Sequence, residues 1–219
     1  MRVIIIGAGG HAQVVADILL RAQEQNVFVQ PIGFLDDHPA LAGQHILGLP
    51  VMGVLAQLQA IPHEAVVIAI GDNATRQRLY ADLQSRGECF AIARHPRAVI
   101  APDVFIGPGS MIAANVVVNT GSVISANAIL NTGSTVDHHN HIGAHAHIAP
   151  GAHLGGHVTV GDGVLVGIGA TVMPGQRVGA WSVVGAGTLV HRDVPEKVTA
   201  VGVPARILKQ QRQAKEMSR

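Results

Sequence analysis

The sequence predicts two structural units in succession, an N-terminal α/β unit and a C-terminal parallel β-solenoid built from six-residue repeats. An aliphatic residue stands at every sixth position from Ile100 to Val190, at sixteen consecutive repeats. Before residue 95, apolar strand patterns alternate with helical patterns. Aromatic residues make up 3% of the chain, so the core must consist of Val, Ile, Leu and Ala, which suits a narrow solenoid.

The period of six carries the solenoid prediction. The repeated positions are Ile100, Ile106, Ile112, Val118, Ile124, Leu130, Val136, Ile142, Ile148, Leu154, Val160, Val166, Val172, Val178, Val184 and Val190. A helix repeats every 3.6 residues and a single strand every two, so neither explains this spacing. Short strands that alternate with turns, each sending one side chain to the axis, do explain it. Three hexapeptides per triangular coil give five coils of eighteen residues.

The N-terminal unit is predicted from strand and helix patterns. Strands are expected at 2–6, 31–35, 65–70 and 90–93, and helices at 12–25, 55–58 and 75–84. The inward face of the first helix is expected to carry Val14, Val15, Ile18, Leu19 and Ala22. This alternation implies a parallel sheet with right-handed crossovers, a small Rossmann-like domain.

A domain boundary is expected at His95-Pro96, because a residue that precedes proline favours an extended backbone. The predicted domains are therefore 1–95 and 96–219. Residues 205–215 read as a short, charged terminal helix.

Composition excludes several classes of function. The net charge of +1 gives no case for a nucleic-acid surface. A lone cysteine, Cys89, excludes an internal disulfide and fits a reducing compartment. The apolar run Val3–Ile6 is too short for a signal peptide, and no stretch reaches the length of a membrane span. We expect a cytoplasmic protein without a membrane partner.

The first strand leads into a glycine-rich turn, Gly7-x-Gly9-x-x-Ala12, just before a helix. Such a turn presents backbone N–H groups to phosphate. Asp36, at the end of the second strand, lies where a ribose hydroxyl is usually held, and His11 would meet a diphosphate. The unit is under 100 residues, which favours a mononucleotide or nucleotide-sugar over NAD. The simpler alternative is that the glycines only permit a tight turn.

Seven of the thirteen histidines lie within a short stretch of the solenoid: His138, His139, His141, His145, His147, His153 and His157. Residues eighteen apart stack directly, about 4.8 Å apart. Only His139 and His157 form such a pair, whereas a catalytic zinc usually needs three protein ligands. A neighbouring subunit could supply a third. We expect no bound metal, and we expect most of these histidines to lie on outward turns as ordinary polar residues.

His138 is the candidate general base. Gly156 follows it by one coil, which leaves open space above the imidazole and a backbone N–H free to donate. A base beside an oxyanion donor is what acyl transfer requires. Asp137, His139 and Asn131 could orient or polarise the ring. The alternative is that His138 is a solvated turn residue.

Motifs along nearly the whole chain carry a resemblance to a known family. They are Gly7-Ala8-Gly9-Gly10-His11, Gly33-Phe34-Leu35-Asp36-Asp37, Ile68-Ala69-Ile70-Gly71-Asp72-Asn73, Asn131-Thr132-Gly133-Ser134-Thr135-Val136-Asp137-His138 and Gly202-Val203-Pro204-Ala205-Arg206. The chain resembles the left-handed β-helix (hexapeptide repeat) acyltransferases. Within them it resembles the bacterial nucleotide-sugar N-acetyltransferases and related sialic-acid O-acetyltransferases. The resemblance implies a left-handed β-helix, an exception to the right-handed crossover rule.

The resemblance also implies an activity. Relatives acetylate the 4-amino group of a UDP-linked 4-amino-4,6-dideoxy sugar, as in the bacillosamine pathway, with acetyl-CoA as co-substrate. They are trimers with active sites between subunits. The general base falls on His138, and nucleotide-sugar contacts fall on Gly9, Gly10, His11, Asp36, Asp37 and Gly71. Acetyl-CoA contacts fall on His147, Gly156, Ile168 and Ala186. Relatives usually carry Glu or Asp after the base, where this chain has His139.

Three alternatives stay open. One is an O-acetyltransferase that acts on sialic acid or a related sugar. The second is a metal-dependent hydratase, which the family builds from histidines two coils apart. The residues thirty-six after His138, His139, His141 and His147 are Pro174, Gly175, Arg177 and Val183, so that pattern is absent. The third is a trimer that only binds a nucleotide-sugar.

We expect direct transfer without a covalent intermediate, because Cys89 lies in the other domain.

Overall fold

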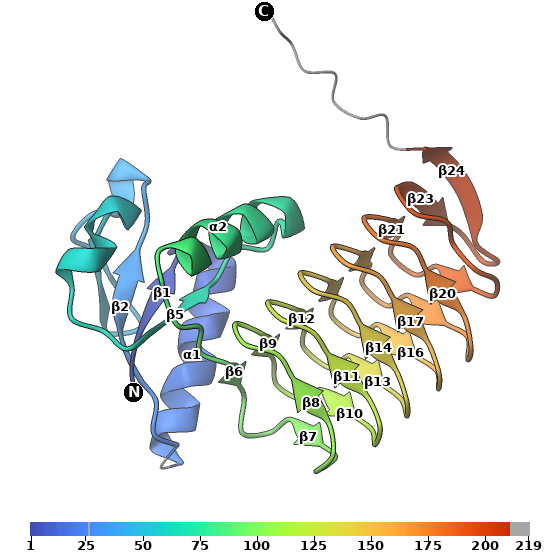
Figure 1. The fold of residues 1–219 in the computed structure, drawn as a ribbon, viewed down its shortest axis with the longest axis horizontal. Helices are drawn as coiled ribbons and strands as arrows, with labels where there is room; N and C mark the ends of the chain where they lie inside the picture. The colour runs from blue at the N-terminus through green and yellow to red at the C-terminus, as the bar shows by residue number, and fades with distance from the viewer. Residues whose placement is uncertain (26, 211–219) are drawn as a thin grey trace, which may run out of the picture.

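The structure, a computed structural model, describes residues 1–25 and 27–210 and contains an α/β domain followed by a three-sided parallel β-helix (Figure 1). The elements of the α/β domain are β1 (Arg2–Ile6), α1 (Gly10–Glu24), β2 (Gln30–Leu35), η1 (Pro39–Leu41), β3 (His45–Ile46), β4 (Leu49–Gly53), η2 (Leu55–Ala60), β5 (Ala65–Ile68) and α2 (Asn73–Ser85). Both fold predictions, an α/β domain and a solenoid of six-residue repeats, are confirmed.

The sheet of the α/β domain has the strand order β3-β4-β2-β1-β5. Its strands run parallel except for the β3–β4 hairpin. Helix α1 covers the sheet with its buried side chains Ala12, Val15, Ala16, Ile18, Leu19 and Ala22. Val14 was predicted on this face but is 40% exposed, because the small side chains of Ala12 and Ala16 take the inward positions.

The β-helix consists of two-residue strands, and each aliphatic residue of the predicted ladder is the second residue of its strand. These strands are β7 (Val99–Ile100), β8 (Phe105–Ile106), β9 (Met111–Ile112), β10 (Val117–Val118), β11 (Val123–Ile124), β12 (Ile129–Leu130), β13 (Thr135–Val136), β14 (His141–Ile142), β15 (His147–Ile148), β16 (His153–Leu154), β17 (Thr159–Val160), β18 (Leu165–Val166), β19 (Thr171–Val172), β20 (Arg177–Val178), β21 (Val183–Val184) and β22 (Leu189–Val190). Ladder residues from Ile112 onward are buried. Ile100 and Ile106 are half-buried, since the first coil has no coil below it.

Strands eighteen residues apart pair in parallel, as Val117 does with Thr135, so the predicted coil length is confirmed. The strands form three sheets. Sheet 1 runs β7-β10-β13-β16-β19-β22, sheet 2 runs β8-β11-β14-β17-β20, and sheet 3 runs β6-β9-β12-β15-β18-β21-β23-β24. One coil visits sheets 1, 2 and 3 in turn, so each corner of the prism recurs every eighteen residues.

Two predicted elements differ at the ends of the β-helix. The strand expected at 90–93 is reduced to a bridge at Phe90, and β6 (Ala93–Arg94) pairs with β9 as the first strand of sheet 3. The predicted helix at 205–215 is wrong where the structure describes it. There β24 (Arg206–Gln210) pairs antiparallel with β23 (Val198–Val201) and ends sheet 3. Residues 211–219 lie outside the described part. The boundary at His95 stays a prediction.

A buried arginine joins the two domains. Arg76, on α2, is 1% exposed. Its guanidinium donates to the carbonyl oxygens of Asn127 and His145 in the β-helix at 3.1 and 2.7 Å, and to that of Ile70 at 3.1 Å. Burial lowers the pKa of Arg76 to about 10. These bonds fix the start of α2 over sheet 3.

Within residues 1–25 and 27–210, no helix combines the length and apolar character that a bilayer crossing requires.

Candidate active site

A cavity of about 650 Å³ lies between the start of α2 and the outer face of sheet 3. It is lined by Gly71, Asp72, Asn73, Ala74, His147, Ala149, Pro150, Gly163, Leu165, Gly167, Ile168, Trp181, Val183, Val184, Gly185 and Ala186. The Asn73 side-chain amide donates to the carbonyl oxygens of Gly163 and Val164, both at 3.1 Å, and so holds α2 against the wall. The cavity thus has one wall from each domain.

Three of the four residues expected to contact acetyl-CoA line this cavity: His147, Ile168 and Ala186. Gly71, expected to contact the nucleotide-sugar, lines it too. Gly156 does not belong to the lining; it lies beside His138 on another edge of the β-helix. The cavity therefore brings together residues from both predicted sets and separates Gly156 from the other three.

The glycine-rich turn forms the start of α1, with Gly9 as the N-cap and Gly7 at a positive φ of 98°. The two carboxylates expected near the sugar nucleotide brace the backbone around it. Asp36 accepts from the N–H groups of Ala8 at 2.7 Å and His38 at 2.8 Å. Asp37 accepts from the Leu55 N–H at 2.8 Å. A carboxylate oxygen can accept more than one hydrogen bond, so the ribose contact of Asp36 stays a prediction.

His11 and His147 form a half-buried pair between the domains, with ring centroids 6.4 Å apart. The pKa of each is lowered to about 4, chiefly by burial and then by the charge of Arg76. Both rings are therefore neutral at pH 7. Nε2 of His11 is buried without a hydrogen-bond partner in the described part of the chain. Because buried polar atoms are normally paired, this nitrogen marks a position for a polar ligand group.

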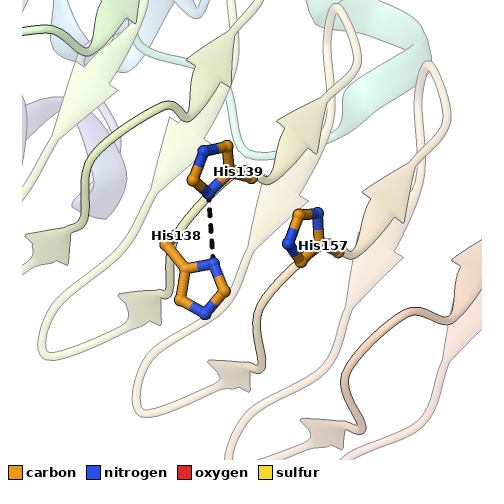
Figure 2. Close-up of side chains that lie close together, drawn as sticks. All are labelled: His138, His139 and His157. Carbon is orange, nitrogen blue, oxygen red and sulfur yellow. Dashed lines mark hydrogen bonds between the residues drawn. The ribbon is translucent and has the colours of Figure 1, made fainter.

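Figure 2 shows a second, separate group, His138, His139 and His157, at the corner between sheets 1 and 2. Nδ1 of His138 lies 3.2 Å from Nδ1 of His139. The rings of His139 and His157 stack at 5.0 Å with an angle of 11° between their planes, as the eighteen-residue spacing predicts. A Cβ built on Gly156 would lie 2.5 Å from the His138 ring, so glycine is what makes room for this imidazole.

Two expected partners of His138 contact other groups in the structure. The Asn131 side chain donates to Nε2 of His147 at 3.1 Å, so it orients that ring and not His138. The Asp137 carboxylate accepts from the Asn119 amide and from the backbone N–H of His138, both at 2.8 Å. These bonds lower the pKa of Asp137. Among the described residues the His138 ring hydrogen-bonds to His139, not to a carboxylate.

The cavity and His138 lie on different sides of the prism. The cavity covers sheet 3 and the two corners that flank it. His138 lies between β13 of sheet 1 and β14 of sheet 2, at the corner opposite sheet 3. A ligand that lies in the cavity of one chain is therefore separated from the His138 of that chain by the body of the β-helix.

Family comparisons agree with this architecture. Residues 2–83 match the PglD N-terminal domain, and residues 97–132 match the bacterial transferase hexapeptide (six repeats). A search of curated proteins found no match.

Solved structures extend the match over nearly the whole chain. PerB from Caulobacter crescentus, in complex with CoA and GDP-perosamine, is 39% identical with a TM-score of 0.86; the match covers 95% of this chain and 98% of that one. The acetyltransferase domain of PglB from Neisseria gonorrhoeae is 33% identical with a TM-score of 0.87, covering 94% and 99%. WeeI from Acinetobacter baumannii is 29% identical with a TM-score of 0.84, covering 95% and 100%. The chain belongs to the PglD-like, hexapeptide-repeat family of nucleotide-sugar N-acetyltransferases that includes PerB and the PglB domain, and it is an acetyltransferase.

Proposed function

We propose that this enzyme transfers the acetyl group of acetyl-CoA to the 4-amino group of a nucleotide-linked 4-amino-4,6-dideoxy sugar, with His138 as general base. The observation that carries the proposal is the imidazole of His138 beneath Gly156, which has no side chain to fill the space beside the ring. The family supports the reaction class, and the two groups of histidines support the proposed roles of ligand binding and proton transfer.

The cavity on sheet 3 is the proposed acetyl-CoA site. Its volume of about 650 Å³ falls in the ordinary range for a small-molecule site. Ile168 is 62% exposed and lies in the cavity wall, where a bound cofactor would cover it. PerB is solved with CoA and the PglB domain with acetyl coenzyme A, which supports the same donor here.

The start of α1 is the proposed site of the sugar nucleotide. Gly9 and Gly10 have open space where side chains would stand, so a diphosphate can approach the backbone N–H groups closely. Gly71 borders the adjoining cavity, and Asp36 and Asp37 hold the loops beside the turn. The unpaired Nε2 of His11 would meet a polar group of the ligand.

The chemistry follows from these positions. The amine nitrogen of the sugar attacks the thioester carbon as a His138 ring nitrogen takes its proton, and the C–S bond then breaks to release coenzyme A. The Gly156 N–H is not engaged by an acceptor in the described part of the chain and is proposed to donate to the oxyanion. His139 is proposed to hold the His138 ring through the 3.2 Å contact between their Nδ1 atoms.

We also propose that the active site is completed between two subunits of a homotrimer. The cavity and His138 of one chain lie on opposite sides of its β-helix, so a donor in the cavity of one chain would meet the His138 of a neighbour. His147 would then help to stabilise the oxyanion from the donor side.

A substrate panel tests the proposal. The purified enzyme is mixed with acetyl-CoA and 4-amino-4,6-dideoxy sugars linked to UDP, GDP or dTDP, and free thiol release and product mass are followed. The sequence resemblance implies UDP as the nucleotide attached to the sugar, whereas the PerB complex contains a GDP-linked sugar. N-acetylation of one of these sugars is the expected result. Acetylation of sialic acid hydroxyls instead, or no thiol release with any acceptor, would overturn it.

A further inference from the structure

We propose that His138, His139 and His157 form a binding site for a divalent transition metal of the zinc class, and that an ion bound there blocks acetyl transfer. Each residue offers one ring nitrogen, and the three atoms lie within 4.8 Å of one another. The spacing of eighteen predicts the His139–His157 pair but leaves the third ligand to another subunit. The structure supplies it from the same chain, through His138.

The distances suit a tetrahedral ion. Two nitrogens that each lie about 2.0–2.1 Å from a tetrahedral zinc are about 3.3 Å from each other. Nδ1 of His138 and Nδ1 of His139 are 3.2 Å apart, close to that length. The wider spacing to His157 closes by rotation of its ring, and rotation about χ2 of histidine meets only a broad, shallow barrier. His157 is exposed, and its ring contacts the rings of His138 and His139.

The backbone holds the group in place. His139 and His157 occupy equivalent corner positions with left-handed φ angles of 57° and 58°, which set their rings in register. Glycines leave room on both sides. A Cβ at Gly121 would lie 2.7 Å from the His139 ring, and one at Gly156 would lie 2.5 Å from the His138 ring. Side chains at Gly121 and Gly156 would therefore crowd the rings of His139 and His138.

Nearby charge favours a cation. Asp103 accepts from the Thr120 hydroxyl at 2.7 Å and from the Gly121 N–H at 2.8 Å. Asp137, which precedes His138, accepts from the Asn119 amide and from the His138 N–H, both at 2.8 Å. Carboxylates carry a negative charge at pH 7. Three neutral imidazoles with an open fourth position form an accepted zinc ligand set.

The functional consequence rests on the proposed function. A general base needs a free lone pair on a ring nitrogen, and a metal held by His138 takes a lone pair of that ring and fixes its orientation. Metal occupancy and proton abstraction by His138 then exclude each other. The ion would act as an inhibitor of this enzyme, not as its cofactor.

Metal binding is tested first, without reference to activity. Chelator-treated, full-length protein is titrated with Co²⁺, followed by visible absorption, and with Zn²⁺, followed by calorimetry. We expect one ion per chain and the intense absorption of tetrahedral Co²⁺. His157→Asn should weaken both by at least about tenfold, since even the loss of a residue behind a ligand costs 10- to 100-fold. Asparagine accepts the left-handed backbone, so the corner is kept.

The control is His141→Asn, an exposed histidine of the same stretch that lies outside the group. It should bind both ions like the wild type, and a thermal melt of each variant should be unchanged. Binding that is absent in the wild type, or equal in His157→Asn, or weakened equally in the control, overturns the proposed site.

Inhibition is measured separately, as the rate with Zn²⁺ divided by the rate of the same variant in chelator. Inhibition should follow the occupancy measured by calorimetry, and His157→Asn should need at least about tenfold more Zn²⁺. A metal that binds at His157 without slowing turnover would refute the inhibition and count against His138 as base, while the site itself would stand. Absence of turnover in chelator would instead count against the proposed function.

Discussion

Two groups of histidines in this molecule differ in almost every physical property except their residue type. His11 and His147 lie half-buried between the domains, and their pKa values are lowered to about 4. His138, His139 and His157 lie on an outer corner of the β-helix, with their rings 5.0–5.3 Å apart. One group is kept neutral by its surroundings, and the other lies on an outer corner that ligands and ions can reach.

The difference shows that location decides what an imidazole does. A neutral, buried ring can orient a ligand through hydrogen bonds but resists taking a proton, because burial penalises the charged form. A ring on an open corner can accept a proton during a reaction. We therefore assign ligand binding to His11 and His147 and proton transfer to the corner group. Substitutions in either group test this division of roles.

The largest expected effect is the loss of His138. His138→Ala should lower kcat by about 10²- to 10⁴-fold, the usual contribution of a positioned general base, and leave the KM for acetyl-CoA nearly unchanged. Thiol release under saturating substrates measures this. His141→Ala, at an exposed position on β14, serves as the control and should keep its rate. Full activity in His138→Ala would remove that residue from the mechanism.

Arg76 joins the domains near the His11–His147 pair, on which its charge acts. Arg76→Met removes the donor for several buried carbonyl oxygens, each of which costs about 1–3 kcal/mol when left unpaired. We expect a loss of about 3 kcal/mol in the free energy of unfolding, seen in denaturant titration. Arg78→Met, on the exposed side of the same helix, should cost less than about 1 kcal/mol. Equal losses of unfolding free energy in the two variants would show that Arg76 does not stabilise the contact between the domains.

The low pKa values of His11 and His147 make stability depend on pH. In the unfolded chain each ring takes a proton near its ordinary pKa of 6.5, whereas in the folded chain it does so near 4. The unfolded state therefore binds more protons between these values, and stability present above pH 6.5 is lost as the pH falls toward 4. His11→Gln should reduce this loss by on the order of 2 kcal/mol. Denaturant titrations at pH 7 and pH 4.5 measure the change, with His141→Gln as the control.

The sequence predicts the β-helix more completely than the site. A period of six with aliphatic residues fixes which side chains point inward, since one face must be buried in every coil. The stacking of His139 on His157 follows from the same period. Other contacts depend on how the two domains meet, which no local pattern encodes. Arg76 lies between the domains, although in the sequence it resembles the exposed Arg78. The bond from Asn131 to His147 joins neighbouring coils of the β-helix and depends on side-chain orientation, which the period of six does not encode.

The smallest effect is expected at the cavity wall. Ile168→Ala removes apolar surface that bound acetyl-CoA would cover. Each fully buried methylene contributes roughly 0.8 kcal/mol, and this side chain would be only partly covered, so the binding free energy should weaken by about 1 kcal/mol. The KM for acetyl-CoA should rise about fivefold with little change in kcat, because this contact would be equally present before and during the reaction. Phe28→Ala, 92% exposed and outside the cavity lining, is the control. A fall in kcat at unchanged KM would place Ile168 near the reacting carbonyl and contradict its role as a contact made equally before and during the reaction.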